Sequence, residues 1–226
     1  MTGHVTWIGG WASPIGLWER EIALLLPACE HRFLDAHELL DGEASLGQEL
    51  SKLDSGSLVV AWSLGSLLAL ELMEAGSWPC GVRLVAVCPV LDFCDLSGPW
   101  RPLVLDRMIR ALGKDLAGTL TSFRERMWPA MPLNFAARWL SRAMRISLPS
   151  LVHGLEVFRD RKVNAALLDG GDITWVTGGR DAVSPVLAGL QGDVHRLDTG
   201  HVPFLEDGNG FRSVLAEIFA ECKSIR

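Results

Sequence analysis

Three side chains in this sequence have the types and the chain order needed for nucleophilic catalysis. Ser63 offers a hydroxyl, Asp181 a carboxylate and His201 an imidazole. A serine hydroxyl attacks a carbonyl carbon efficiently only when a histidine takes its proton and an acid orients that histidine. We therefore predict acyl-transfer chemistry, with Ser63 as nucleophile, His201 as base and Asp181 as the orienting acid.

The residues around Ser63 are typical of a serine presented on a sharp turn between a strand and a helix. An apolar run at 57–62 stops at Ser63, and a helical apolar pattern begins directly afterwards. Such a turn lifts the hydroxyl clear of the sheet and needs small residues two positions before and after the serine. Ala61 and Gly65 meet this need, although glycine is more usual at the first position. Without its partners, Ser63 can also be an ordinary turn serine.

The acid and the base each follow a predicted strand. Asp181 comes after an apolar run at 172–177, and His201 after a short run at 193–197. Catalytic groups collect beyond the carboxyl ends of strands in open α/β sheets. Asp181 can also be a helix cap and His201 a structural loop residue, so these alternatives stay open. Asp92, after the preceding strand, is a rival acid that we rank second because it opens a helical insertion.

A glycine pair after the first predicted strand, 4–8, indicates a site for the negative oxygen that develops in acyl transfer. Backbone N–H groups of Trp11 and Leu64 are the predicted donors to this oxygen. Trp11, Trp62 and Trp100 are candidates for lining an apolar acyl pocket, and ordinary core packing is the alternative. The remaining histidines show no metal-ligand spacing. We expect no metal and no cofactor.

Apolar runs alternate with helical patterns over most of the chain. This alternation predicts an α/β fold with a mostly parallel sheet of about six strands flanked by helices. The expected strands are 4–8, 32–35, 57–62, 82–88, 172–177 and 193–197. The expected helices outside the insertion are 15–26, 44–53, 64–75, 184–190 and 209–223.

The alternation fails between residues 93 and 162, where helical patterns appear without strands. The expected helices there are 103–112, 117–128, 133–146 and 151–158. We therefore predict a core made of 1–92 and 163–226, with 93–162 inserted as a helical lid. Lids close over substrates and exclude water from the chemistry.

Charge is unevenly distributed between these parts. The chain of 226 residues has a net charge of −6, yet 93–162 holds twelve basic and six acidic residues. Arg138, Arg142 and Arg145 fall on one face of a predicted helix, which is either a solvated face or a docking face for an anion. The acidic bulk is a poor fit to nucleic acid.

The remaining bulk properties fit a soluble intracellular protein. No apolar stretch reaches 18 residues, so no membrane span is predicted. The start of the chain lacks a secretory signal pattern. Five cysteines without a CxxC pair fit reduced thiols in the cytoplasm. We expect a cytoplasmic monomer.

Several segments together resemble a known family. They are Gly10-Trp11, Trp62-Ser63-Leu64-Gly65, Leu151-Val-His-Gly-Leu-Glu-Val-Phe158, Gly178-Gly-Arg-Asp181 and His201-Val-Pro-Phe204. Over nearly its full length the chain resembles an α/β-hydrolase, and more narrowly the pimeloyl-[acyl-carrier protein] methyl ester esterases of biotin synthesis.

This resemblance implies the same nucleophile, acid, base and oxyanion donors. It also implies a lid whose arginines receive an acyl carrier protein, with Arg138, Arg142, Arg159 and Arg161 in the matching region. The expected activity is serine carboxylic ester hydrolysis of a methyl ester on a carrier-bound pimeloyl chain. Two alternatives remain: a carbon–carbon lyase or hydrolase acting on an anionic metabolite, as in the menaquinone pathway, and a non-catalytic hydrolase-like binding protein.

Overall fold

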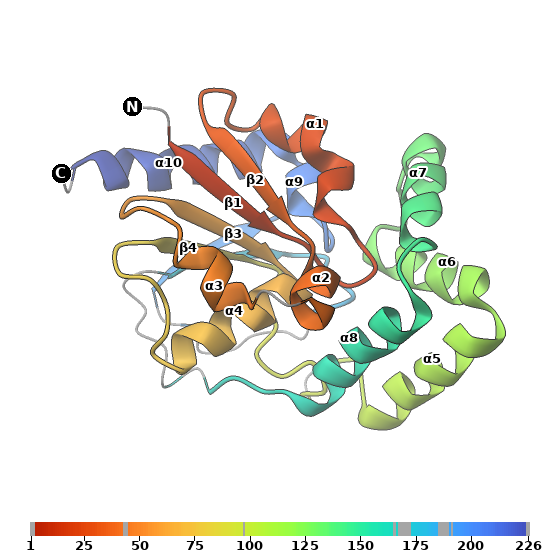
Figure 1. The fold of residues 1–226 in the computed structure, drawn as a ribbon. Helices are drawn as coiled ribbons and strands as arrows, with labels where there is room; N and C mark the ends of the chain where they lie inside the picture. Colours follow the sequence, from red (N-terminus) through yellow and green to blue (C-terminus); the bar gives the residue numbers. More distant parts are fainter. Residues whose placement is uncertain are drawn as a thin grey trace.

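Six parallel strands form one sheet in a computed structural model that describes residues 3–42, 45–96, 98–164, 166, 173–184, 190 and 192–224. Their order across the sheet is β2-β1-β3-β4-β5-β6 (Figure 1). The strands are β1 His4–Ile8, β2 Glu30–Leu34, β3 Leu58–Trp62, β4 Arg83–Val87, β5 Ile173–Gly178 and β6 Asp193–Leu197. All five pairings are parallel. The predicted α/β fold and its six strands are confirmed.

The sequence of each strand matches its place in the sheet. Every residue of the central strand β3 is buried, as a strand covered on both faces requires. The outermost strands β2 and β6 instead carry charged and partly exposed side chains, which discourage pairing with another chain at the sheet edge.

Helices cover both faces of the sheet. Figure 1 shows α2, α3 and α4 on one face, with α1, α9 and α10 on the other. The elements are a 3-10 turn at Ile15–Trp18, α1 Glu19–Ala23, α2 Ala36–Asp41, α3 Leu46–Leu50, α4 Leu64–Glu74, α9 Pro203–Glu206 and α10 Gly208–Ser224. The sequence did not predict α2 or α9, which are each too short to show a helical period.

Two predicted helices differ from the observed ones, and a third cannot be compared. The helix expected at 15–26 is the 3-10 turn followed by α1. The helix expected at 44–53 is shortened to α3, where Ser45 and Gln48 form a reciprocal cap at its start. The helix expected at 184–190 falls mainly on residues 185–189, which lie outside the described residues.

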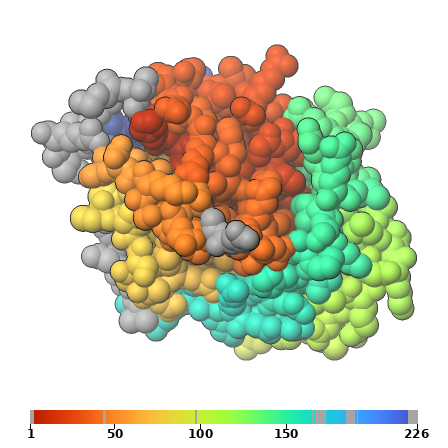
Figure 2. Space-filling model, viewed as in Figure 1, coloured from red at the N-terminus to blue at the C-terminus, as the bar shows by residue number. Residues whose placement is uncertain are grey.

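Four further helices lie between β4 and β5 in the chain and gather beyond the carboxyl ends of the strands (Figure 1). They are α5 Pro102–Lys114, α6 Leu116–Met127, α7 Leu133–Ala143 and α8 Leu148–Asp160. We call them the helical segment. Figure 2 shows α8 lying against α2 on the surface of the molecule. None of the helices in the described ranges is both long and apolar enough to cross a lipid bilayer.

The end of α7 corrects the prediction of one arginine-bearing face at Arg138, Arg142 and Arg145. The helix was expected to run to Ile146 but ends at Ala143, and the amide of Arg145 bonds to the carbonyl of Arg142 in a turn. Ser147 then caps the start of α8 through the amide of Ser150. Since Arg145 lies beyond the helix, helical spacing no longer fixes its direction.

Candidate active site

Ser63 adopts the strained backbone expected of a serine on a sharp turn between strand and helix. It follows β3 directly, precedes α4, and has φ 54° and ψ −112°. Gly65 lies against the loop after β1, and its amide bonds to the Gly9 carbonyl at 3.0 Å. A Cβ at Gly65 would lie 2.6 Å from that same oxygen, so only glycine fits. The small residue predicted two positions after Ser63 is therefore required by the packing.

Backbone strain is concentrated around Ser63. The described residues other than glycine with positive φ are Ala12, Ser63 and Cys88. They follow β1, β3 and β4, three adjacent strands of the sheet. A non-glycine residue in this region costs free energy and persists only where the surroundings hold it, which is typical of functional sites. The strain marks this end of the sheet as the candidate site.

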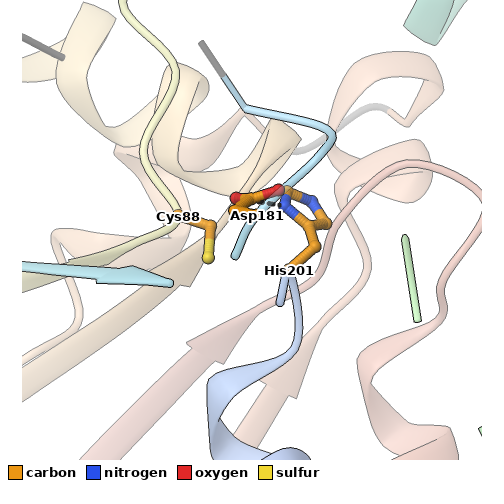
Figure 3. A group of neighbouring side chains, drawn as sticks. All are labelled: Cys88, Asp181 and His201. Carbon is orange, nitrogen blue, oxygen red and sulfur yellow. Dashed lines mark hydrogen bonds and ion pairs between the residues drawn. The ribbon is translucent and has the colours of Figure 1, made fainter. Parts of the chain in front are cut away.

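Asp181 and His201 form a buried pair beside Ser63's strand. The Nδ1 atom of His201 lies 2.9 Å from Oδ2 of Asp181, with side chains 1% and 7% exposed (Figure 3). The other carboxylate oxygen accepts the amides of Val183 and Ser184. One carboxylate oxygen of Asp181 thus faces His201 and the other accepts two amides of its own loop. The helix that Asp181 was alternatively expected to cap falls mainly on residues 185–189, outside the described residues.

The surroundings of Asp181 keep its carboxyl ionised. Burial alone would raise the pKa of Asp181, but the positive charge available on His201 and the hydrogen bond to it outweigh burial, together with the two loop amides. The net pKa of Asp181 is lowered. Because a carboxylate only accepts hydrogen bonds, Nδ1 of His201 carries the proton and Nε2 is left as an acceptor.

The rival acid, Asp92, has a different partner. Its carboxylate pairs with Lys162 and also accepts the amide of Cys94. Of the two candidate acids, Asp181 is the one whose carboxylate contacts His201.

Trp62, the residue before Ser63, contacts the loop that carries His201. Its indole N–H donates to the His201 carbonyl at 2.8 Å, and the two rings lie 5.5 Å apart. Among the described residues, no hydrogen bond reaches the Ser63 hydroxyl. Such contacts are often long in proteins without substrate and tighten in the complex.

The glycine turn, which we define as residues 9–13, lies next to Ser63. Its Gly10 has the Trp62 ring and the Ser63 Cβ as neighbours. In the described part of the chain, the amides of Trp11 and Leu64 have no backbone partner, whereas the Gly65 amide is bonded to Gly9. Neither of the two amides predicted as oxyanion donors is therefore bonded to a backbone carbonyl in this part of the structure.

The helical segment packs directly on this site. Phe123 of α6 lies edge-on to Trp11 at 4.7 Å between ring centroids. The indole N–H of Trp11 donates to the Leu151 carbonyl of α8, and that of Trp139 in α7 donates to the Ser13 hydroxyl. The His201 amide bonds to the carbonyl of Met127 in α6. Ser63 and His201 are only 2% and 1% exposed as a result.

The three tryptophans predicted to line an acyl pocket are packed as structural side chains. Trp11, Trp62 and Trp100 are each at most 6% exposed. The Trp100 indole donates to the carbonyl of Val183, two residues from Asp181. Each indole N–H thus holds a backbone carbonyl in place, which favours the core-packing alternative over direct substrate contact.

Sequence reasoning missed Cys88, which borders the pair. Its Sγ lies within 4.8 Å of the nearest ligand atoms of Asp181 and His201, and Figure 3 shows Asp181 between the other two residues. Within the described residues this is the one trio spaced to share a metal ion. However, burial, with the charge of Asp181, raises the pKa of the Cys88 thiol well above its usual value. Both carboxylate oxygens of Asp181 already accept hydrogen bonds, one from His201 and one from two loop amides, so the trio fits a hydrogen-bonded network better.

The predicted arginines separate into two groups. Arg138 pairs with Glu21 at 2.8 Å and lies over the Trp18 and Phe135 rings. Arg142 and Arg145 instead line a cavity of about 520 Å³ between α2 and the start of α8. In the described ranges neither forms an ion pair, and the acidic residues Asp35, Glu38 and Asp41 line the same cavity.

This fold and site define an α/β-hydrolase. The chain belongs to the alpha/beta hydrolase family, whose model matches residues 9–213. No curated protein matches the chain in sequence.

Solved structures with the same fold include two esterases and a lactonase. An esterase from Exiguobacterium antarcticum is 16% identical with a TM-score of 0.77, covering 96% of this chain and 92% of that one. A putative aryl esterase from Burkholderia cenocepacia is also 16% identical with a TM-score of 0.77, covering 99% and 92%. The enol-lactonase from Burkholderia xenovorans LB400 is 12% identical with a TM-score of 0.73, covering 97% and 92%.

Proposed function

We propose that this protein is a serine carboxylic ester hydrolase with Ser63, His201 and Asp181 as its catalytic triad. The observation that carries the proposal is the buried His201–Asp181 pair at the same sheet end as the strained Ser63. Three strand ends, of β3, β5 and β6, supply one residue each. The similarity to solved esterases supports the fold on which this arrangement depends.

In the proposed reaction, Ser63 attacks the ester carbonyl while Nε2 of His201 takes the hydroxyl proton. Asp181, kept ionised by its partners, holds the imidazole in the required tautomer and stabilises its cation. The negative oxygen of the tetrahedral intermediate accepts hydrogen bonds from the Trp11 and Leu64 amides. His201 returns the proton to the departing alcohol and then activates water to hydrolyse the acyl-enzyme.

We further propose that residues 93–162 act as a lid. With Ser63 and His201 almost fully covered, a substrate reaches them only when the helical segment moves. The contacts to be broken include those of Phe123 with Trp11 and of Met127 with His201. They also include the hydrogen bonds from Trp11 to Leu151 and from Trp139 to Ser13. Closure afterwards excludes water from the reacting atoms.

The finer proposal for the substrate is a methyl ester on a pimeloyl chain carried by an acyl carrier protein. Its support is the excess of basic residues in 93–162. Within that range Arg142 and Arg145 form no ion pair among the described residues, and they share their cavity with Asp35, Glu38 and Asp41. Arg138, Arg159 and Arg161 are engaged in ion pairs and support it less.

The test combines a fluorophosphonate probe with p-nitrophenyl esters of graded chain length, followed by the methyl pimeloyl carrier protein. The wild type should be labelled at Ser63 and should hydrolyse some of these esters. Ser63→Ala should lose labelling and lower kcat by on the order of 10⁶, as removal of a catalytic serine does elsewhere. Ser122→Ala, on the exposed surface of α6, is the matched control and should behave as wild type.

Each alternative gives a different result in the same experiment. An unlabelled Ser63 with no ester turned over indicates a non-catalytic binding protein. If the probe labels Ser63 but none of the esters is hydrolysed, the result indicates a carbon–carbon lyase or hydrolase. Full ester hydrolysis by Ser63→Ala would rule out the proposed nucleophile.

A further inference from the structure

His37 is a buried histidine that bonds to two separate parts of the molecule. It lies on α2 and is 6% exposed. Its Nε2 is 2.9 Å from the amide nitrogen of Ala12 in the glycine turn. Its Nδ1 is 3.1 Å from the Ser150 carbonyl in α8. One imidazole therefore connects the turn beside Ser63 to the helical segment.

The two partners define the protonation state of this ring. The Ala12 amide can only donate, so Nε2 must be the unprotonated acceptor. The Ser150 carbonyl can only accept, so Nδ1 must carry the proton. A doubly protonated ring would place an N–H against the N–H of Ala12. The arrangement therefore requires the neutral imidazole in a single tautomer.

The residue that His37 holds is one of the strained ones. Ala12 has φ 52°, a conformation that side-chain-bearing residues adopt only where the surroundings enforce it. It directly follows Trp11, whose amide is a proposed oxyanion donor. The neighbouring α8 carbonyl, of Leu151, accepts the Trp11 indole at 2.8 Å. Two successive carbonyls of one helix thus fix this turn, one directly and one through His37.

We propose that His37 is a positioning residue that fixes the glycine turn in the conformation required of an oxyanion site. This inference rests on the proposed hydrolase function. His37 acts through Ala12 and does not itself touch the substrate. Its effect should appear in the stabilisation of the transition state more than in substrate affinity.

Burial keeps His37 neutral at ordinary pH, despite an acidic neighbour. Burial lowers its pKa to about 4, against opposing effects of the Ser150 carbonyl and Asp41. His153 of α8 faces it as well. Asp35, Glu38, Arg142 and Arg145 line the cavity that His37 borders.

The first arm of the test measures amide hydrogen exchange in the peptide that contains the glycine turn, and it needs no activity. Wild type and His37→Gln should protect this peptide, because the glutamine amide offers both an acceptor and a donor. His37→Leu should lose protection. His153→Gln, which changes a half-exposed histidine on α8, is the control and should match wild type. Full protection in His37→Leu overturns the proposal.

The second arm measures ester hydrolysis and inhibition by octyl trifluoromethyl ketone, which forms a tetrahedral adduct with an active serine. His37→Leu should lower kcat about tenfold or more, as small displacements of catalytic groups do, with KM within about twofold. Affinity for the ketone should fall by the same factor as kcat/KM, and His37→Gln should recover most of both. A rise in KM with kcat unchanged in His37→Leu would contradict a positioning role. So would a His37→Gln variant that recovers neither kcat/KM nor affinity for the ketone.

The two arms separate this inference from the proposed function. If the turn loosens in His37→Leu but the wild type hydrolyses no ester, the hydrolase proposal fails while the structural role of His37 stands. If the wild type is active and His37→Leu is equally active, the inference about His37 fails alone. If His37→Leu does not fold, His37→Asn, too short to reach Ala12, takes its place in both arms.

Discussion

The two halves of the proposed site are built by different parts of the molecule. The Asp181–His201 half stands on loops that follow β5 and β6, and its main hydrogen bonds stay within those loops. The glycine-turn half is held from outside the sheet, by Phe123, Trp139 and Leu151 of the helical segment. Residues 93–162 contact the first half through the backbone bond from His201 to Met127 and through the indole of Trp100, which donates to the Val183 carbonyl.

This difference separates two functions of the helical segment. The proposed proton-transfer groups keep their geometry mainly through contacts inside the core. The proposed oxyanion donor at Trp11 depends on α8, both directly and through His37. Movement of the helices should therefore weaken stabilisation of the negative oxygen before it disturbs the proton-transfer pair. A lid of this kind would complete the electrostatic part of the site when it closes.

The largest effect on the core half is expected from Asp181→Asn. Asparagine keeps the shape of the side chain but allows the wrong imidazole tautomer. The same substitution lowers kcat by on the order of 10⁴ in a serine protease with a Ser-His-Asp triad. Asp92→Asn is the matched control and should leave kcat nearly unchanged, because Asp92 pairs with Lys162. Steady-state kinetics of both variants test this assignment. A severe loss of kcat in Asp92→Asn with a mild loss in Asp181→Asn would identify Asp92 as the catalytic acid.

Stability at low pH should depend on the glycine-turn half through His37. The pKa of His37 is about 4 in the folded protein and near 6.5 when unfolded, so the unfolded chain binds more protons between these values. Stability should therefore fall as pH drops from 6.5 to 4, by up to about 3 kcal/mol. His37→Gln should remove this part of the dependence. Urea unfolding at several pH values measures it, and identical pH curves for the two proteins would contradict it.

A smaller effect on the glycine-turn half is expected from Gly154→Ala. An added Cβ would lie 2.6 Å from Cδ1 of Trp11 and 3.2 Å from Cε1 of His37. Displacing Trp11 should lower kcat about tenfold, and overpacking should lower the free energy of unfolding by about 1–3 kcal/mol. Gly113→Ala, with open space around the new methyl group, should instead stabilise α5 by about 0.5–1 kcal/mol. Unchanged kcat in Gly154→Ala would show that the turn tolerates movement of α8.

The smallest effect is expected outside both halves, at the arginines. Arg142→Glu with Arg145→Glu should raise KM for the methyl pimeloyl carrier protein several-fold in low salt and less in high salt, because exposed charges are screened. Hydrolysis of p-nitrophenyl esters should stay near the wild-type rate. Arg138→Glu should lower thermal stability, since it loses the ion pair with Glu21 and two ring contacts. Equal KM for the carrier substrate in all variants would remove the charge-based support for that partner.

The core half could be predicted from the sequence and the glycine-turn half only in part. Ser63, Asp181 and His201 each follow an apolar strand, so local patterns alone locate them at one sheet edge. His37 and Cys88 also come after strands, β2 and β4, but their local sequence indicates no partner. Their roles arise from contacts with Ala12, Ser150 and Asp181, far away in the chain. Arg145 was wrongly predicted to lie on α7. Helix ends are set by capping, and the periodicity of apolar residues does not reveal where a helix is capped.

The tryptophan hydrogen bonds have a spectroscopic consequence. The chain contains nine tryptophans and no tyrosine, so its near-ultraviolet emission comes almost entirely from indole rings. Four of these indoles, Trp11, Trp62, Trp100 and Trp139, donate to loops and helices that meet at the candidate site. Any opening that breaks these bonds exposes the rings to water and shifts their emission to longer wavelength. The protein therefore carries an intrinsic optical reporter of access to Ser63, without an attached label.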